Sequence, residues 1–91
     1  MTDPTLAEFR DRIDVLDEQL IRLLAERFDI TKQVGAFKAE AGLPPADPSR
    51  EATQIERLRA IADDAGMDPE FSETVFRLIV DEVIRHHEKL R

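Results

Sequence analysis

The sequence predicts an all-α protein with three helices, one very long N-terminal helix and two shorter ones, that forms an intertwined homodimer. Apolar residues recur at alternating steps of three and four, which is the spacing of one face of a helix. The dipeptide Asp-Pro precedes each of three such stretches, and no stretch shows the strict alternation of a β-strand. Residues 1–91 are expected to form a single helical domain, because a chain of this length is too short for two independent cores.

The first helix is expected to run from Asp3 to about Ala41. At about 1.5 Å per residue it is about 57 Å long, whereas a compact chain of this size has a radius of gyration near about 12 Å. Its apolar seam is therefore too long to be buried by its own chain, and a second copy is the economical partner. The alternative is an extended, monomeric helical hairpin whose apolar seam is exposed to solvent. The seam positions are Leu6, Phe9, Ile13, Leu16, Leu20, Leu23, Arg27, Ile30, Val34, Phe37 and Ala41.

Two shorter helices follow, from Pro48 to about Ala65 and from Pro69 to near Leu90. The aspartates before them are good N-caps, and proline suits the first helical position because no N–H partner is needed there. Gly42 and Gly66 are natural C-terminal stops. Gly35, inside the first helix, costs about 1 kcal/mol relative to Ala, so close packing is expected to require it. The apolar faces are Ala52, Ile55, Leu58, Ala62 and Ala65 in the second helix, and Phe76, Ile79, Val80, Val83, Ile84, His87 and Leu90 in the third.

Composition and charge argue against several classes of function. The formal net charge of -7 disfavours nucleic acid as a partner, because phosphate contacts need a basic surface. No apolar run approaches the roughly 20 residues of a membrane span, and the N-terminus lacks the basic and apolar regions of a signal peptide. Without cysteine the chain has no disulfide, no thiolate nucleophile and no cysteine-based metal site. A cytoplasmic location is expected.

Two cations of the first helix stand on or beside the apolar seam. Arg27 points to the centre of the seam, and Lys38 lies about 20° from it. Their Cα atoms are about 16 Å apart along the axis, so the two long side chains can lean together onto one small anion. A buried cation without an opposite charge costs several kcal/mol. The alternatives are that an acidic residue of the second or third helix neutralises them, or that both reach water.

Further candidates lie in the two shorter helices. Arg50 and Glu51 occupy the first turn of the second helix, whose N-terminus at Asp47 offers N–H groups to an anion or a hydroxyl. His87 lies in the apolar face of the third helix, where a lone histidine is more often a packed core residue than a working one. His86 and His87 are neighbours and lack the spacing of metal ligands. The site is expected to use no nucleophile, metal or cofactor.

Seven short segments of the sequence carry a resemblance to one enzyme family. They are Leu6-Ala-Glu-Phe-Arg10, Ile13-Asp-Val-Leu-Asp17, Leu23-Leu-Ala-Glu-Arg27 and Val34-Gly-Ala-Phe-Lys38 in the first helix, Asp47-Pro-Ser-Arg50-Glu51 and Ile55-Glu-Arg-Leu58 in the second, and Phe76-Arg-Leu-Ile79 in the third. Together they closely resemble the all-helical (type II) chorismate mutases over nearly the whole chain. Several separated cations in register with the helical period make this signal fairly specific.

The resemblance implies a homodimeric enzyme that converts chorismate to prephenate by a Claisen rearrangement. Prephenate feeds phenylalanine and tyrosine synthesis, and the reaction needs no cofactor. By position, Arg27 would bind one substrate carboxylate. Arg10 of the partner subunit would bind the second. Lys38 would donate to the ether oxygen of the substrate and to a neighbouring carboxylate.

The second and third helices supply the other contacts that the resemblance implies. The backbone N–H of Asp47 and the side chain of Glu51 would hold the ring hydroxyl, and Arg50 would complete the cationic wall. His87 stands where the family usually has Gln or Glu, so its ring would donate to the ether oxygen, in either tautomer or as imidazolium. Val83 stands where well-studied members carry a hydroxyl side chain near a substrate carboxylate.

The departures at Val83 and His87 leave other activities open on the same fold. Relatives include isochorismate-pyruvate lyases and mutases that act on 4-amino-4-deoxychorismate. The segment from Lys38 to Arg50 resembles that of the mutases, which favours chorismate as the substrate. A non-enzymatic helical dimerisation or regulatory module is the third possibility. No dehydratase, dehydrogenase or regulatory domain accompanies the mutase-like segment, so a free-standing enzyme is expected.

Overall fold

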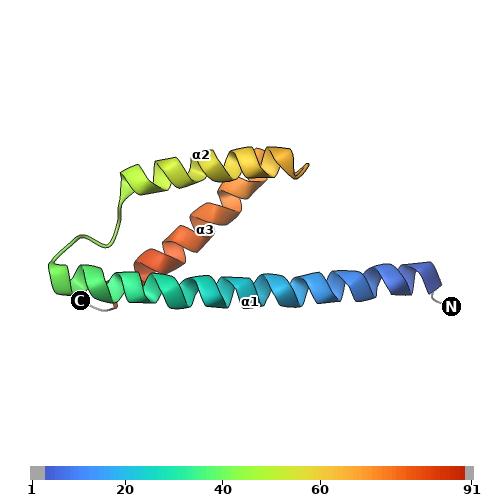
Figure 1. Cartoon of the computed structure of the whole chain (residues 1–91), viewed down its shortest axis with the longest axis horizontal. Helices are drawn as coiled ribbons and strands as arrows, with labels where there is room; N and C mark the ends of the chain where they lie inside the picture. Colours follow the sequence, from blue (N-terminus) through green and yellow to red (C-terminus); the bar gives the residue numbers. More distant parts are fainter. Residues whose placement is uncertain (1–3, 90–91) are drawn as a thin grey trace. The chain divides into compact units, whose positions relative to one another are not determined.

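The computed structural model describes residues 4–89, and within that range it consists of three helices and their connections (Figure 1). The helices are α1 (Pro4–Ala41), α2 (Pro48–Asp64) and α3 (Pro69–Glu88). No strand occurs between residues 4 and 89, so the expected all-α class is confirmed. The expected start at Asp3 and the expected apolar position Leu90 lie outside the described residues.

The starts of α2 and α3 are fixed by the aspartates that precede them. Asp47 Oδ1 accepts a hydrogen bond from the backbone N–H of Arg50 at 3.1 Å, and Asp68 Oδ1 accepts from that of Glu70 at 3.0 Å. Each bond satisfies one of the N–H groups that have no partner inside the first turn. Proline follows each aspartate at the first helical position, as the sequence predicts.

The ends of α1 and α2 are closed by glycines in the left-handed region. Gly42 has a φ of 70° and Gly66 a φ of 79°. The N–H groups that follow them turn back onto the helix, from Leu43 to Lys38 O and from Met67 to Ala62 O, each at 2.8 Å. This is the Schellman arrangement, which favours glycine because a Cβ is strained at positive φ. The linker 42–47 therefore leaves α1 in a defined direction.

The chain divides into two compact units, residues 1–31 and residues 32–91, along the continuous helix α1. In the first unit the apolar seam is exposed, with Leu16 at 61%, Leu20 at 56% and Leu23 at 63%. This exposure agrees with the prediction that the seam is not buried by its own chain. The single domain of residues 1–91 stays a prediction.

The second unit has its core where α2 and α3 pack against each other (Figure 1). Ala62 of α2 and Phe76 of α3 are buried. At the edge of this core, Glu73 accepts from Arg59 Nη1 at 2.9 Å and from Arg77 Nε at 3.1 Å and Nη2 at 2.9 Å. The hydrogen bonds from Arg77 and then Arg59 lower the pKa of the Glu73 carboxyl, although its desolvation acts in the opposite sense. Within residues 4–89, none of the helices combines the length and apolar character that a membrane crossing requires.

Candidate active site

Lys38, in the last turn of α1, points to the linker that follows the helix. Its Nζ donates to the carbonyl oxygen of Pro45 at 3.2 Å, and the side chain is half-buried. The ion pairs formed among residues 4–89 do not include Lys38. The partner of this ammonium is therefore a neutral carbonyl, and the alternative that an acidic residue of α2 or α3 neutralises it has no support in the described residues.

His87 reaches the same carbonyl oxygen from α3. Its Nδ1 lies 3.4 Å from Pro45 O, and the residue is only 4% exposed. The other edge of the ring lies against α1, because a Cβ built on Gly35 would stand 2.4 Å from His87 Cδ2. No real Cβ contact is that short, so this ring position requires glycine at 35. The expectation that close packing explains Gly35 is confirmed.

The first turn of α2 carries three more of the expected site residues. The side chain of Asp47 is engaged as the N-cap, and its backbone carbonyl accepts from the N–H of Glu51 at 3.0 Å. Arg50 is exposed and Glu51 is half-buried. Val83 is half-buried on α3, one helical turn before His87. Lys38 and His87 thus meet at the linker, and the turn that follows the linker presents Asp47, Arg50 and Glu51.

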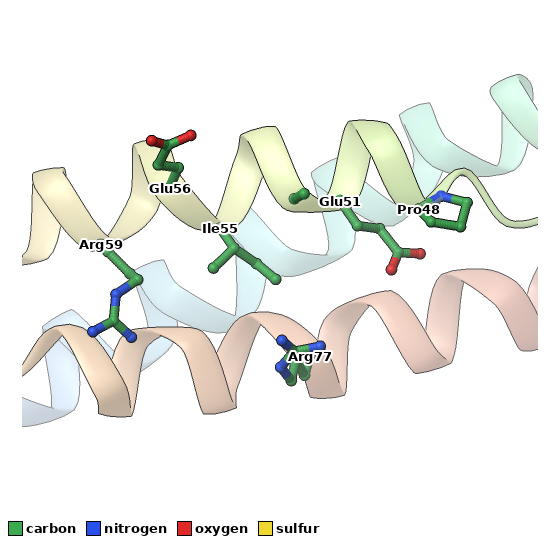
Figure 2. Close-up of a pocket in the computed structure, with 7 residues that line it drawn as sticks. Pro48, Glu51, Ile55, Glu56, Arg59 and Arg77 are labelled. Carbon is green, nitrogen blue, oxygen red and sulfur yellow. The ribbon is translucent and has the colours of Figure 1, made fainter.

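Glu51 also borders two hollows between α2 and α3. The larger, of about 380 Å³, is an open groove in which Glu51 and Arg59 reach from α2 toward α3, whereas Glu56 points away (Figure 2). Its lining is Pro48, Glu51, Ala52, Ile55, Glu56, Arg59 and Arg77. The smaller, of about 150 Å³, is lined by Glu51, Ile55, Phe76, Arg77, Val80, Asp81 and Ile84. Neither hollow is bordered by Lys38 or His87.

Two expected site residues, Arg10 and Arg27, belong to the first unit. Arg10 is exposed. Arg27 is half-buried, and its Nη1 atom is buried. Both lie on α1, the helix that also carries Lys38. Their roles as carboxylate ligands stay predictions.

The carbonyl of Pro45 is the site feature that sequence reasoning missed. Every residue carries a backbone carbonyl group, whatever its side chain, so no sequence pattern singles this one out. A usable signal was Gly35, because a glycine inside a helix indicates that another group approaches closely. The pair of Glu73 and Arg77 could have been predicted, because the two residues are four apart on one helix. The pair of Glu73 and Arg59 joins two helices and has no such signal in the sequence.

Comparison with known proteins assigns the chain to a family. The family model for chorismate mutase type II matches residues 9–88. A chorismate mutase of Methanocaldococcus jannaschii is 32% identical over 76 residues, which are 84% of this chain and 77% of that protein. A T-protein of Enterobacter agglomerans is 38% identical over 77 residues, 85% of this chain and 21% of that protein.

Longer relatives match over a fraction of their length. The bifunctional chorismate mutase/prephenate dehydratase of Escherichia coli is 34% identical over 82 residues, which are 90% of this chain and 21% of that protein. The chain thus spans about a fifth of the T-protein and of this bifunctional protein. The match to the family model begins within α1 and ends at the last residue of α3. It therefore includes the last turn of α1, the linker and the first turn of α2. The expected resemblance is confirmed, and the chain belongs to the chorismate mutase type II family of isomerases.

Proposed function

We propose that this chain catalyses the rearrangement of chorismate to prephenate. The observation that carries the proposal is Lys38, a half-buried ammonium that donates to a neutral carbonyl, inside a family match that spans residues 9–88. An ammonium held in this way can donate to an anionic oxygen at little cost in reorganisation. The reaction class is an intramolecular isomerisation, which needs neither a nucleophile nor a cofactor.

The substrate contacts that we propose come from α1, α2 and α3. Arg27 binds one carboxylate of chorismate, and Arg10 of the partner subunit binds the other. Lys38 donates to the ether oxygen whose bond to carbon breaks. The backbone N–H of Asp47 and the carboxylate of Glu51 hold the ring hydroxyl. Arg50 completes the cationic wall, and Val83 and His87 form the wall that α3 contributes.

Two physical effects account for rate enhancement by such a site. Chorismate is a flexible dianion, and two guanidinium groups that grip its carboxylates hold it in the compact, chair-like conformer that reacts. Negative charge grows on the ether oxygen as the C–O bond lengthens, so a donor such as Lys38 stabilises the transition state more than the ground state. Neither effect requires a covalent intermediate.

We further infer that a second copy of the chain covers the exposed seam of α1. Seven seam residues of the first unit are between 41% and 63% exposed, and each large apolar side chain that becomes fully buried contributes about 1.5–3 kcal/mol. The residues are Leu6, Phe9, Ile13, Leu16, Leu20, Leu23 and Ile30. Arg10 lies within this stretch, which supports its proposed delivery to the site of the partner.

The decisive experiment is an ultraviolet assay of chorismate consumption with the purified chain. We expect consumption well above the spontaneous rate. Arg27→Ala and Lys38→Ala should each lower kcat/KM by about 10²- to 10³-fold, because each removes a charge-stabilising donor. The matched controls are Arg22→Ala and Lys32→Ala, which remove exposed cations of the same helix and should leave activity unchanged. Consumption at the spontaneous rate would refute the proposal.

Parallel assays separate the alternative functions. Isochorismate should be tested beside chorismate, because a lyase of this fold releases pyruvate from isochorismate, and 4-amino-4-deoxychorismate should be tested as a third substrate. A non-enzymatic module is distinguished by thermal shift. A dicarboxylate substrate analogue at about 100 times its Kd should stabilise a binding-competent chain by about 2.7 kcal/mol. A helical module without an anion site should show no shift.

A further inference from the structure

Three segments of the second unit meet at the carbonyl oxygen of Pro45. Lys38 Nζ, in the last turn of α1, donates to this oxygen at 3.2 Å. His87 Nδ1, near the end of α3, lies 3.4 Å from it. Pro45 itself stands in the linker between α1 and α2. One backbone acceptor therefore connects the linker to the end of α1 and to α3.

The contact with Pro45 favours one tautomer of the His87 ring. A carbonyl oxygen can only accept, so a hydrogen bond at this contact requires the proton on Nδ1, the nitrogen that faces Pro45 O. The opposite edge of the ring is packed on α1, where a Cβ at Gly35 would stand 2.4 Å from Cδ2 and 2.9 Å from Nε2. The ring is thus held at one edge by a polar contact and at the other by van der Waals contact.

Pro45 is close in the chain to the first turn of α2, so a contact that fixes Pro45 also restricts the position of this turn. Only Ala46 separates Pro45 from Asp47, which is the N-cap of α2. The carbonyl of Asp47 accepts from the N–H of Glu51 at 3.0 Å, so the turn moves with its cap. Lys38 is oriented by the same carbonyl, and an ammonium that spends one N–H on Pro45 has two left for a ligand oxygen.

We propose that His87 is a positioning residue that acts through the carbonyl of Pro45. It holds the linker so that Lys38 Nζ and the first turn of α2 keep a fixed relation to each other. The consequence for activity rests on the proposed function, in which Lys38 contacts the ether oxygen and Asp47 and Glu51 contact the ring hydroxyl. This role differs from the expectation that the imidazole itself donates to the ether oxygen.

The first test determines the tautomer of His87 and needs no substrate. The chain has two histidines, so in the His86→Gln variant every imidazole signal belongs to His87. A long-range ¹H–¹⁵N spectrum, recorded at a pH where the ring is neutral, should place the proton on Nδ1. A proton on Nε2 would overturn the proposal, because Pro45 O would then face a nitrogen that cannot donate to it.

The second test uses two amides that reach different positions of the ring. In Asn the amide nitrogen is attached to Cγ, as Nδ1 is, whereas the amide nitrogen of Gln lies one bond further out, as Nε2 does. His87→Asn should keep KM within about threefold of the parent. His87→Gln should raise KM about tenfold, the equivalent of one hydrogen bond, with a smaller change in kcat. The neighbouring His86→Gln variant is the matched control and should behave as the parent.

The two tests separate this inference from the proposed function. Full activity of His87→Gln with loss in His87→Asn would mean that the side chain donates from the Nε2 position. An equal loss in both variants would mean that a donor at the Nδ1 position does not restore the role of the ring. Either result contradicts the positioning role. If the parent chain does not consume chorismate, the proposed function fails, and the tautomer of His87 still decides whether its ring holds the linker.

Discussion

Replacing Gly35 with alanine tests the packing of His87 on α1 with a change of one methyl group. The added Cβ would stand 2.4 Å from Cδ2 of the ring, whereas ordinary van der Waals contacts lie between 3.4 and 4 Å. The ring must therefore withdraw by about 1 Å, away from α1. His87 is 4% exposed and is in contact with Pro45 O on its other side, so it has little room to do so.

The expected effect of Gly35→Ala is the difference between two terms. Forcing a methyl group into a packed site costs about 1–3 kcal/mol. Alanine in a helix interior returns about 1 kcal/mol relative to glycine. The net cost is about 1 kcal/mol, which lowers the Tm of a chain of this size by about 4–8 °C. Ala is normally the better residue inside a helix, so a destabilising result in itself indicates a steric cause.

The sign of the effect should reverse when the ring is removed. In a His87→Ala background the added methyl meets no imidazole, so Gly35→Ala should stabilise by about 1 kcal/mol through helix propensity alone. The double-mutant cycle then gives a coupling of about 2 kcal/mol between positions 35 and 87. Gly66→Ala is the matched control, because a Cβ there has nothing within 4 Å and is strained by a φ of 79°, whichever residue occupies position 87.

Thermal and chemical unfolding at one protein concentration measures all four members of the cycle, because a dimer would make Tm depend on concentration. If Gly35→Ala stabilised the parent as much as the His87→Ala variant, the coupling would be zero. The ring would then not lie where steric contact with position 35 matters, and the account of Gly35 would be refuted.

Three further outcomes follow from contacts elsewhere in the chain. Arg77 is the main cause of the lowered pKa of Glu73, so this carboxylate contributes stability above its ordinary pKa of 4.5 that is lost as the pH falls through the lower folded value. The parent should therefore have a higher Tm than Glu73→Gln at neutral pH, and this difference should disappear in acid. A Tm difference that does not change with pH would contradict this prediction. Asp47→Ala removes an N-cap and should cost about 1 kcal/mol in denaturant unfolding, and no loss would show that the cap is replaceable. Leu20→Glu should give a monomer in sedimentation while Glu18→Gln, on the solvated face, should not; an unchanged mass for Leu20→Glu would exclude the seam as the interface.

The helix boundaries could be predicted from the sequence because they depend on local chemistry. The aspartate accepts a hydrogen bond from an N–H of the first turn, and the proline stands at a position where an N–H would have no partner. Asp47 and Asp68 both cap their helices in this way, as expected. Gly42 and Gly66 end theirs because the reversing backbone adopts positive φ. None of these interactions spans more than a few residues, so the helical period of the apolar residues and the positions of the Asp-Pro pairs and glycines suffice to locate the helix ends.

The contacts of the candidate site could not be predicted in the same way, because they join residues that are distant in sequence. The pattern placed His87 on the buried face of α3, and it is buried. The pattern could not reveal that one edge of the ring lies on Gly35 and the other faces Pro45. A donor's role depends on which atom it faces, and here that atom is a backbone carbonyl 42 residues away in the chain. Residue identity thus constrains the chemistry of a site more strongly than it constrains its geometry.

The position of Lys38 on α1 explains how one helix can serve both packing and chemistry. In the second unit the face that contains Gly35 is buried, whereas the seam residues Val34 and Phe37 are 42% and 64% exposed. At 100° per residue, Lys38 lies about 40° from Val34 and about 60° from Gly35, on the boundary between the two faces. Its stem therefore borders the packed face, where the carbonyl of Pro45 orients the ammonium. The seam beside it stays available to a second copy, so filling that seam need not displace the contact that holds Lys38 in place.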